Sequence, residues 1–143
     1  MNQTKAKTSP SRTFRGGGFL SPVKGRGRWA KLCLEAALGP AAALCRASRG
    51  DVLQDEALRA VALRALQEAV AVANKCGERL GRRRMSREML AACRRPGARR
   101  RAEYLSQVEK TLAPLLAAAK KNGTPVPILS RLLRLSRRLE AGL

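Results

Sequence analysis

The sequence predicts an all-α domain, a bundle of about five helices, from three observations. Apolar residues make up 45% of the 143 residues but aromatic residues only 3%, so the core must be aliphatic. Leucine and alanine, which supply most of it, favour helices over strands. Apolar residues also recur at steps of three and four in several segments, the spacing of one helical face, and no segment carries a strand signal. A chain of this length fits one domain.

The first 27 residues are expected to form a disordered basic tail, because they hold too few apolar groups to offset the entropy of ordering. Within them Gly25 to Ala30 reads G-x-G-x-x-A, the pattern of a loop that binds the pyrophosphate of a dinucleotide. Such a loop follows a buried strand, and turn-forming residues stand there instead, so we interpret the match as chance. The tail composition is shared by organelle transit peptides, and import is therefore an alternative to the expected cytoplasmic location.

The folded domain is expected over residues 28–143 and begins with a densely apolar helix from Trp29 to Leu38. Gly39 and Pro40 follow, and a proline lacks the amide proton that a helix interior needs, so we predict a break or kink there. The helix should resume over 41–45 and be followed by a turn over 48–51.

The most regular apolar pattern runs from Leu58 to Cys76 and predicts a long helix with one buried face. Acidic residues precede it, where negative charge complements a helix N-terminus, and Gly77 follows, where a left-handed residue would end it. Ser86 is expected to cap a short helix.

Prolines punctuate the second half of the chain. Pro96 and Gly97 should end the short helix, and a longer one should run from about 98 to 122 with a bend at Pro114. Pro127 suits the first turn of a last helix with a leucine-rich face.

The net charge of +20 predicts attraction to polyanions, and the absence of histidine removes the commonest general base and the commonest zinc ligand. No apolar run reaches the roughly 18 residues of a membrane span. Four widely spaced cysteines in apolar helical patterns are interpreted as reduced core thiols: Cys33, Cys45, Cys76 and Cys93.

Three segments, taken in order, resemble one known family. They are Trp29-Ala30-Lys31-Leu32 with the Ala/Leu/Gly/Pro run to Pro40, then Arg49-Gly50-Asp51-Val52-Leu53 before a long helix, and Asn122-Gly123-Thr124-Pro125-Val126-Pro127 before the last helix. Together they resemble the C-terminal helical domain of ketopantoate reductases (2-dehydropantoate 2-reductases), with the helical fold of the 6-phosphogluconate dehydrogenase C-terminal type. The resemblance spans about Trp29 to Glu140.

The resemblance implies an NADPH-dependent oxidoreductase of pantothenate biosynthesis, in which an N-terminal Rossmann domain holds the cofactor and this helical domain contacts the substrate. No Rossmann pattern accompanies the helical part here. We therefore expect no cofactor bound by this chain alone and no catalysis by it alone. Its partner would be a separate Rossmann-domain chain or a second copy in a homodimer.

Only one functional residue of the family carries over. Lys31 matches the lysine that acts as general acid on the ketone oxygen, which makes it the candidate catalytic residue. Glu35 and Gly39 stand where the family has two substrate-binding asparagines, while 94–97 and Gln107 stand at its serine segment and its glutamate. A lysine on an apolar helix also often extends to water without a catalytic role, and that structural interpretation stays open.

The alternative function is a basic helical module that binds nucleic acid or another polyanion without sequence specificity. It predicts one continuous face of arginines, whereas the reductase interpretation predicts that Lys31 opens into a cleft near Gly39 and Pro40. The basic clusters that support this alternative are Arg82–Arg84, Arg94–Arg95 and Arg99–Arg101, with Arg131, Arg134, Arg137 and Arg138 along the last helix. The predicted face consists of Arg82, Arg99–Arg101 and the arginines of the last helix.

Overall fold

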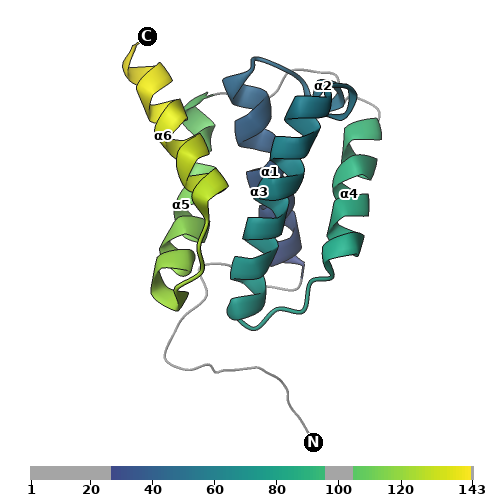
Figure 1. The fold of residues 1–143 in the computed structure, drawn as a ribbon, viewed down its shortest axis with the longest axis vertical. Coiled ribbons are helices and arrows are strands. Elements are labelled where there is room, and N and C mark those ends of the chain that lie inside the picture. Colours follow the sequence, from purple (N-terminus) through teal and green to yellow (C-terminus); the bar gives the residue numbers. More distant parts are fainter. Residues whose placement is uncertain (1–26, 96–104, 143) are drawn as a thin grey trace, which may run out of the picture.

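The computed structural model describes residues 27–95 and 105–142, which form six α-helices and contain no strand (Figure 1). The all-α prediction is confirmed, with one helix more than expected. The tail over 1–26 and the predicted helix stop at 96–97 lie outside the described residues. The helices are α1 (Arg28–Leu44), α2 (Arg49–Gln54), α3 (Glu56–Lys75), α4 (Arg82–Arg94), α5 (Leu105–Asn122) and α6 (Pro127–Ala141).

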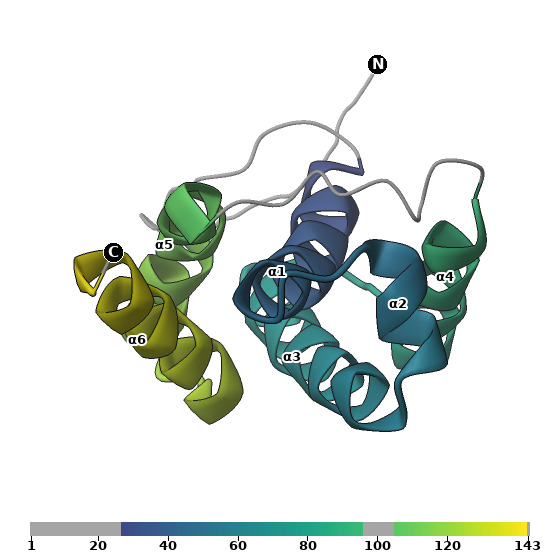
Figure 2. The same cartoon turned by 90° about the horizontal axis from the view of Figure 1, so that it is seen from above.

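Two antiparallel helices, α1 and α3, form the centre of the bundle. The pair α5 and α6 packs on one side of them, and α2 and α4 pack on the other (Figures 1 and 2). Helix α1 contacts all five other helices, whereas α4 and α6 do not contact each other. The two outer pairs are therefore separated by the central helices.

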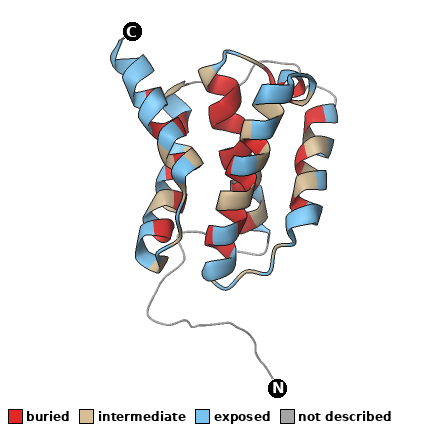
Figure 3. Ribbon diagram, in the orientation of Figure 1, coloured by how far each residue is buried: buried red, intermediate tan, exposed pale blue. Residues whose placement is uncertain are grey.

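The central position of α1 follows from its sequence. Every residue from 36 to 43 is buried, which includes Gly39 and Pro40, and a helix that is apolar on all sides has to be enclosed (Figure 3). The helix does not break here, because α1 continues through both residues to Leu44, and the kink that was the other expectation stays a prediction. A proline in a helix interior costs about 3 kcal/mol, and the packing of five neighbours around α1 outweighs that cost.

The predicted turn over 48–51 is also wrong, because Ser48 is the N-cap of the short helix α2. The Ser48 hydroxyl accepts a hydrogen bond from the Asp51 amide at 3.1 Å, and the Asp51 carboxylate accepts one from the Ser48 amide at 3.0 Å. This reciprocal capping box satisfies two amides that a helix start would otherwise leave unpaired. Asp55 then caps α3 by accepting from the Leu58 amide.

Helix α4 begins earlier than expected. Ser86 is not its cap but lies in its second turn, since the helix starts at Arg82. Met85, Met89 and Cys93 are buried at steps of four, so Met85 is the first residue of the buried face and the turn before it is helical too.

The last helix begins at Pro127, as predicted. Its N-cap residue Val126 has no side-chain cap, and Glu68 of α3 performs that role from a distance. The Glu68 carboxylate accepts hydrogen bonds from the amides of Ile128 and Leu129, each at 2.9 Å. Helix α5 continues through Pro114.

The core of the described residues is built mainly from alanine, leucine, valine and methionine, with two cysteines and Trp29 as its aromatic residue. All four cysteines are free thiols, and Cys33 and Cys93 are buried as predicted. Cys76 is only partly buried, and Cys45 is exposed because it follows the last turn of α1 as its C-cap, so the core assignment of Cys45 is wrong. None of the described helices has the length and apolarity needed to cross a membrane.

Candidate functional site

Lys31 is exposed and lines an open cleft of about 520 Å³. The cleft lies between the start of α1, the loop that follows α3, and the first half of α4. Its walls are formed by Gly27, Ala30, Lys31, Leu34, Glu78, Arg79, Leu80, Gly81, Arg84, Met85 and Glu88.

The loop wall of this cleft is held by Asn74, near the end of α3. The Asn74 side chain accepts a hydrogen bond from the Leu80 amide at 2.8 Å and donates one to the Leu80 carbonyl at 3.1 Å. Gly77 adopts a φ of +103°, a left-handed conformation that suits glycine, and the Glu78 amide returns to the Ala73 carbonyl at 3.1 Å. These contacts turn the chain back so that Glu78 and Arg79 face the cleft.

The cleft combines both signs of charge over an apolar base. Lys31, Arg79 and Arg84 bring positive charge, and Glu78 and Glu88 bring negative charge. Arg84 Nε donates to the Glu88 carboxylate at 3.0 Å, so part of this charge is neutralised within α4. Together with Arg79, which has no partner among the described residues, these charges make the cleft suited to binding a small polar molecule.

The buried thiol beside the cleft does not add a nucleophile at neutral pH. Burial, and then the negative charge of Glu78, raises the pKa of Cys33 to about 12. Cys33 therefore stays protonated at neutral pH.

The substituted asparagine positions do not contribute to the cleft. Glu35 accepts a hydrogen bond from Arg49 Nη2 at 2.7 Å, so its carboxylate is held toward α2. Gly39 and Pro40 are buried, and Gly39 lies about 12 Å along the helix from Lys31. The prediction that the cleft opens near Gly39 and Pro40 is therefore wrong, although Lys31 does line a cleft.

The remaining family positions lie away from Lys31. Gln107 is exposed near the start of α5, and α1 and α5 begin at opposite ends of the bundle (Figure 1). Arg94 and Arg95 are exposed at the far end of α4. The structure thus surrounds Lys31 with residues that sequence reasoning missed, because the loop after α3 and the middle of α4 meet α1 only in the folded chain.

The described arginines of the alternative function lie on two separate helices, and whether the whole set forms one continuous face stays a prediction. Those that open α4 and those along α6 belong to the two outer helices that do not contact each other (Figure 2). Arg99–Arg101 lie outside the described residues. Arg137 is further engaged by Glu109 of α5 through two hydrogen bonds, at 3.0 and 2.6 Å.

The fold and the cleft together define a class: an all-α domain whose first helix presents a lysine to an open, charged cleft. Residues 25–140 match the family model described as the C-terminal domain of ketopantoate reductase PanE/ApbA. Since the match covers most of the chain, this protein belongs to that family as its C-terminal helical part. A comparison with curated proteins gave no match.

Proposed function

We propose that this chain supplies the substrate side of an NADPH-dependent 2-dehydropantoate 2-reductase, with Lys31 as the general acid. The observation that carries the proposal is that Lys31, the one functional residue shared with the family, lines an open cleft of about 520 Å³. Cleft volumes of roughly 300–1,000 Å³ are typical of small-molecule sites. In this role the Lys31 ammonium group donates a proton to the ketone oxygen of the substrate.

The cofactor requires a second domain. Nothing in residues 27–95 and 105–142 fits a dinucleotide, because they include no strand, and Gly27 of the G-x-G-x-x-A match is the N-cap of α1 with a φ of +81°. NADPH would supply the hydride when bound, and the proposal requires a Rossmann domain from outside these residues, for which a separate chain is our proposed source. The helical chain alone is proposed to be inactive.

Arg79 is proposed to hold the carboxylate of the keto acid. The family binds its substrate through asparagines, and Glu35 and Gly39 at those positions make no contact with the cleft. Arg79 lines the cleft with Lys31 and makes no hydrogen bond or ion pair with another described residue. A guanidinium group matches a carboxylate in charge and in fork geometry.

The test is NADPH oxidation with ketopantoate by the purified chain, alone and after addition of lysate from its source. We expect turnover only with lysate, and a loss of roughly 10²- to 10⁴-fold in Lys31→Ala, the range for removal of a general acid. Lys110→Ala is the matched control, since Lys110 is exposed on α5, outside the cleft. Equal turnover in the two variants, or none in any condition, would contradict the proposal.

A second candidate is salt-dependent binding of polyanions, which rests on the net charge of +20. The separation of the α4 and α6 arginines favours two distinct patches over one extended face.

A homodimer is a further proposal, supported by Leu135 and Leu139 of α6, which are 41% and 46% exposed. The cytoplasmic location, with organelle import as its alternative, stays a prediction.

A further inference from the structure

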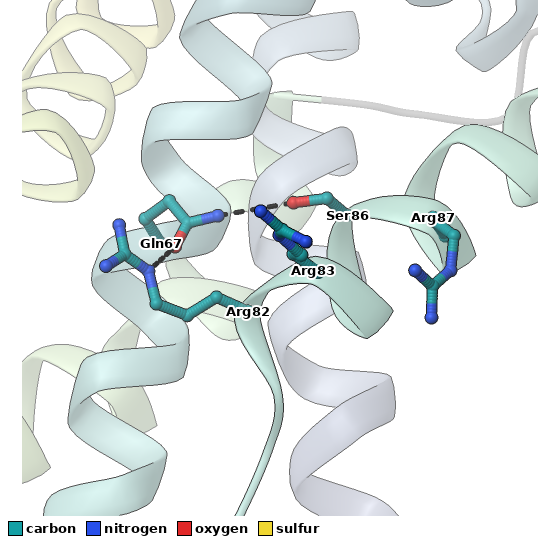
Figure 4. A pocket seen from close by; sticks show the side chains of 5 residues that line it. All are labelled: Gln67, Arg82, Arg83, Ser86 and Arg87. Atoms are coloured by element: carbon teal, nitrogen blue, oxygen red, sulfur yellow. Dashed lines mark hydrogen bonds between the residues drawn. The ribbon is translucent and has the colours of Figure 1, made fainter.

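A second hollow lies on the other side of α4 from the Lys31 cleft. It measures about 570 Å³ and is lined by Gln67 of α3 with Arg82, Arg83, Ser86 and Arg87 of α4 (Figure 4). No lining residue is shared with the Lys31 cleft. What this hollow binds is thus independent of the proposed reductase role.

A chain of hydrogen bonds organises one wall of the hollow. Arg82 Nε donates to Gln67 Oε1, and Gln67 Nε2 donates to the Ser86 hydroxyl at 3.2 Å (Figure 4). Because Ser86 Oγ accepts this bond, its own proton remains available to a ligand. The terminal nitrogens of Arg82 are likewise free of these contacts, while its side chain is held against α3.

The two other arginines of the hollow carry uncompensated charge. Neither Arg83 nor Arg87 makes a hydrogen bond or ion pair with another described residue. They are four residues apart, so they occupy the same face of α4 as a like-charged pair. No acidic residue belongs to the described lining, and Glu88, the acid of this helix, pairs with Arg84.

We propose that this hollow binds the dianionic phosphate group of a small molecule. A phosphate monoester carries a charge of about −1.5 to −2 and three acceptor oxygens, which match two unpaired guanidinium groups and one hydroxyl donor. The arginine side chains present planar forks suited to phosphate oxygens. The described lining has no aromatic side chain on which a nucleic-acid base could stack, so a small phosphate compound fits better than a single strand.

Isothermal titration calorimetry at constant ionic strength tests the proposal, with glycerol 3-phosphate and inorganic phosphate as probes and glycerol as the uncharged control. We expect both phosphates to bind and glycerol not to bind. Tighter binding of the ester than of inorganic phosphate would identify an organic phosphate as the ligand source, and equal binding would identify free phosphate; either outcome supports the phosphate site.

The site is located by two matched double variants. Arg83→Ala with Arg87→Ala should weaken phosphate binding at least tenfold. Arg131→Ala with Arg134→Ala removes the same charge from α6 and should change the affinity by less than twofold. All four arginines are exposed, so both variants should keep the circular dichroism spectrum of the original chain.

Three results would overturn the proposal. One is no phosphate binding by the original chain. Another is an equal loss in both double variants, which would mean attraction to net charge alone. The third is binding of a dT oligonucleotide that depends on Arg83 and Arg87 in the absence of glycerol 3-phosphate binding, which would assign the surface to nucleic acid.

Discussion

Helix α4 separates two hollows of similar size that differ in charge. On one side Arg84, Met85 and Glu88 face the Lys31 cleft, where carboxylates and cations occur together. On the other side Arg82, Arg83, Ser86 and Arg87 face a hollow with positive charge alone among its described lining. Seven consecutive residues of one helix therefore serve two different electrostatic environments.

The difference arises from spacing along the helix. Arg84 and Glu88 are four residues apart and pair at 3.0 Å, whereas Arg83 and Arg87 have the same spacing and the same sign. An opposite pair at this spacing stabilises a helix by about 0.2–0.5 kcal/mol, and a like pair destabilises it by a similar amount. The net charge of the chain is thus a weaker guide to a binding site than the positions of the charged side chains that have no partner.

We expect the largest effect from a substitution that loosens the packing of α4, the helix that forms a wall of both hollows. Met89 of α4 is fully buried, at 0% exposure, and Met89→Ala should lower the free energy of unfolding by about 2–5 kcal/mol through the lost burial and the cavity. Urea unfolding measures it. Both Lys31-dependent turnover and phosphate binding should weaken, because α4 forms a wall of each hollow.

The control is Lys110→Ala at an exposed position on α5, which should change the free energy of unfolding by no more than about 0.5 kcal/mol. If Met89→Ala lost only one of the two activities, the two hollows would not both depend on the packing of α4.

The stability of the protein should also depend on pH through Cys33, the buried thiol near the Lys31 cleft. Burial and then Glu78 raise the pKa of Cys33 from 9.0 to about 12, so above pH 9 the thiol ionises in the unfolded chain but not in the folded one. The unfolded state then binds fewer protons, and stability falls as pH rises from 9 toward 12, by about 1.4 kcal/mol per pH unit.

Comparison of urea unfolding at pH 8 and pH 10 isolates this contribution. At pH 10 the original chain should lose about 1.4 kcal/mol more than Cys33→Ala, since lysine titration is common to both. An identical loss in the two proteins would show that the Cys33 thiol is not held in its neutral form.

Much of the fold was predictable from local patterns. The apolar periodicity of 58–76 predicted α3, and Pro127 and the leucines after it predicted α6. Local rules did not exclude a break of α1 at Pro40, and the helix is continuous there because five neighbouring helices enclose it. They failed at α2, since Ser48 and Asp51 form a capping box that only the paired hydrogen bonds distinguish from a turn.

The candidate sites were less predictable. Family resemblance identified Lys31, but Glu78 and Arg79 reach the cleft through the Asn74 contacts with Leu80. The second hollow depends on Gln67 and Ser86, which are 19 residues apart and on different helices. A sequence shows which side chains can form hydrogen bonds, and the packing of α3 against α4 decides which of them do.

We expect the smallest change in stability from a substitution that replaces one of the arginines of the second hollow with an acidic residue. Arg83 is the second residue of a helix whose N-cap, Gly81, has no side-chain cap and whose first turn has no acid. In Arg83→Glu the new carboxylate would lie near the positive end of the helix dipole and four residues before Arg87. Both effects favour the helix, so we expect a gain of about 0.3–1 kcal/mol in the free energy of unfolding.

The same substitution should abolish phosphate binding, because the carboxylate would repel the ligand and engage Arg87. Arg134→Glu on α6 makes an equal change in net charge but does not place a carboxylate at the start of a helix. It should therefore leave phosphate binding intact and give a smaller gain in the free energy of unfolding. Urea unfolding and phosphate calorimetry measure the two effects on one sample. A gain in stability with loss of binding would mean that Arg83 destabilises its own helix and supports the ligand, as expected where function and stability compete. If Arg83→Glu still bound phosphate, phosphate binding would not account for the like-charged pair formed by Arg83 and Arg87.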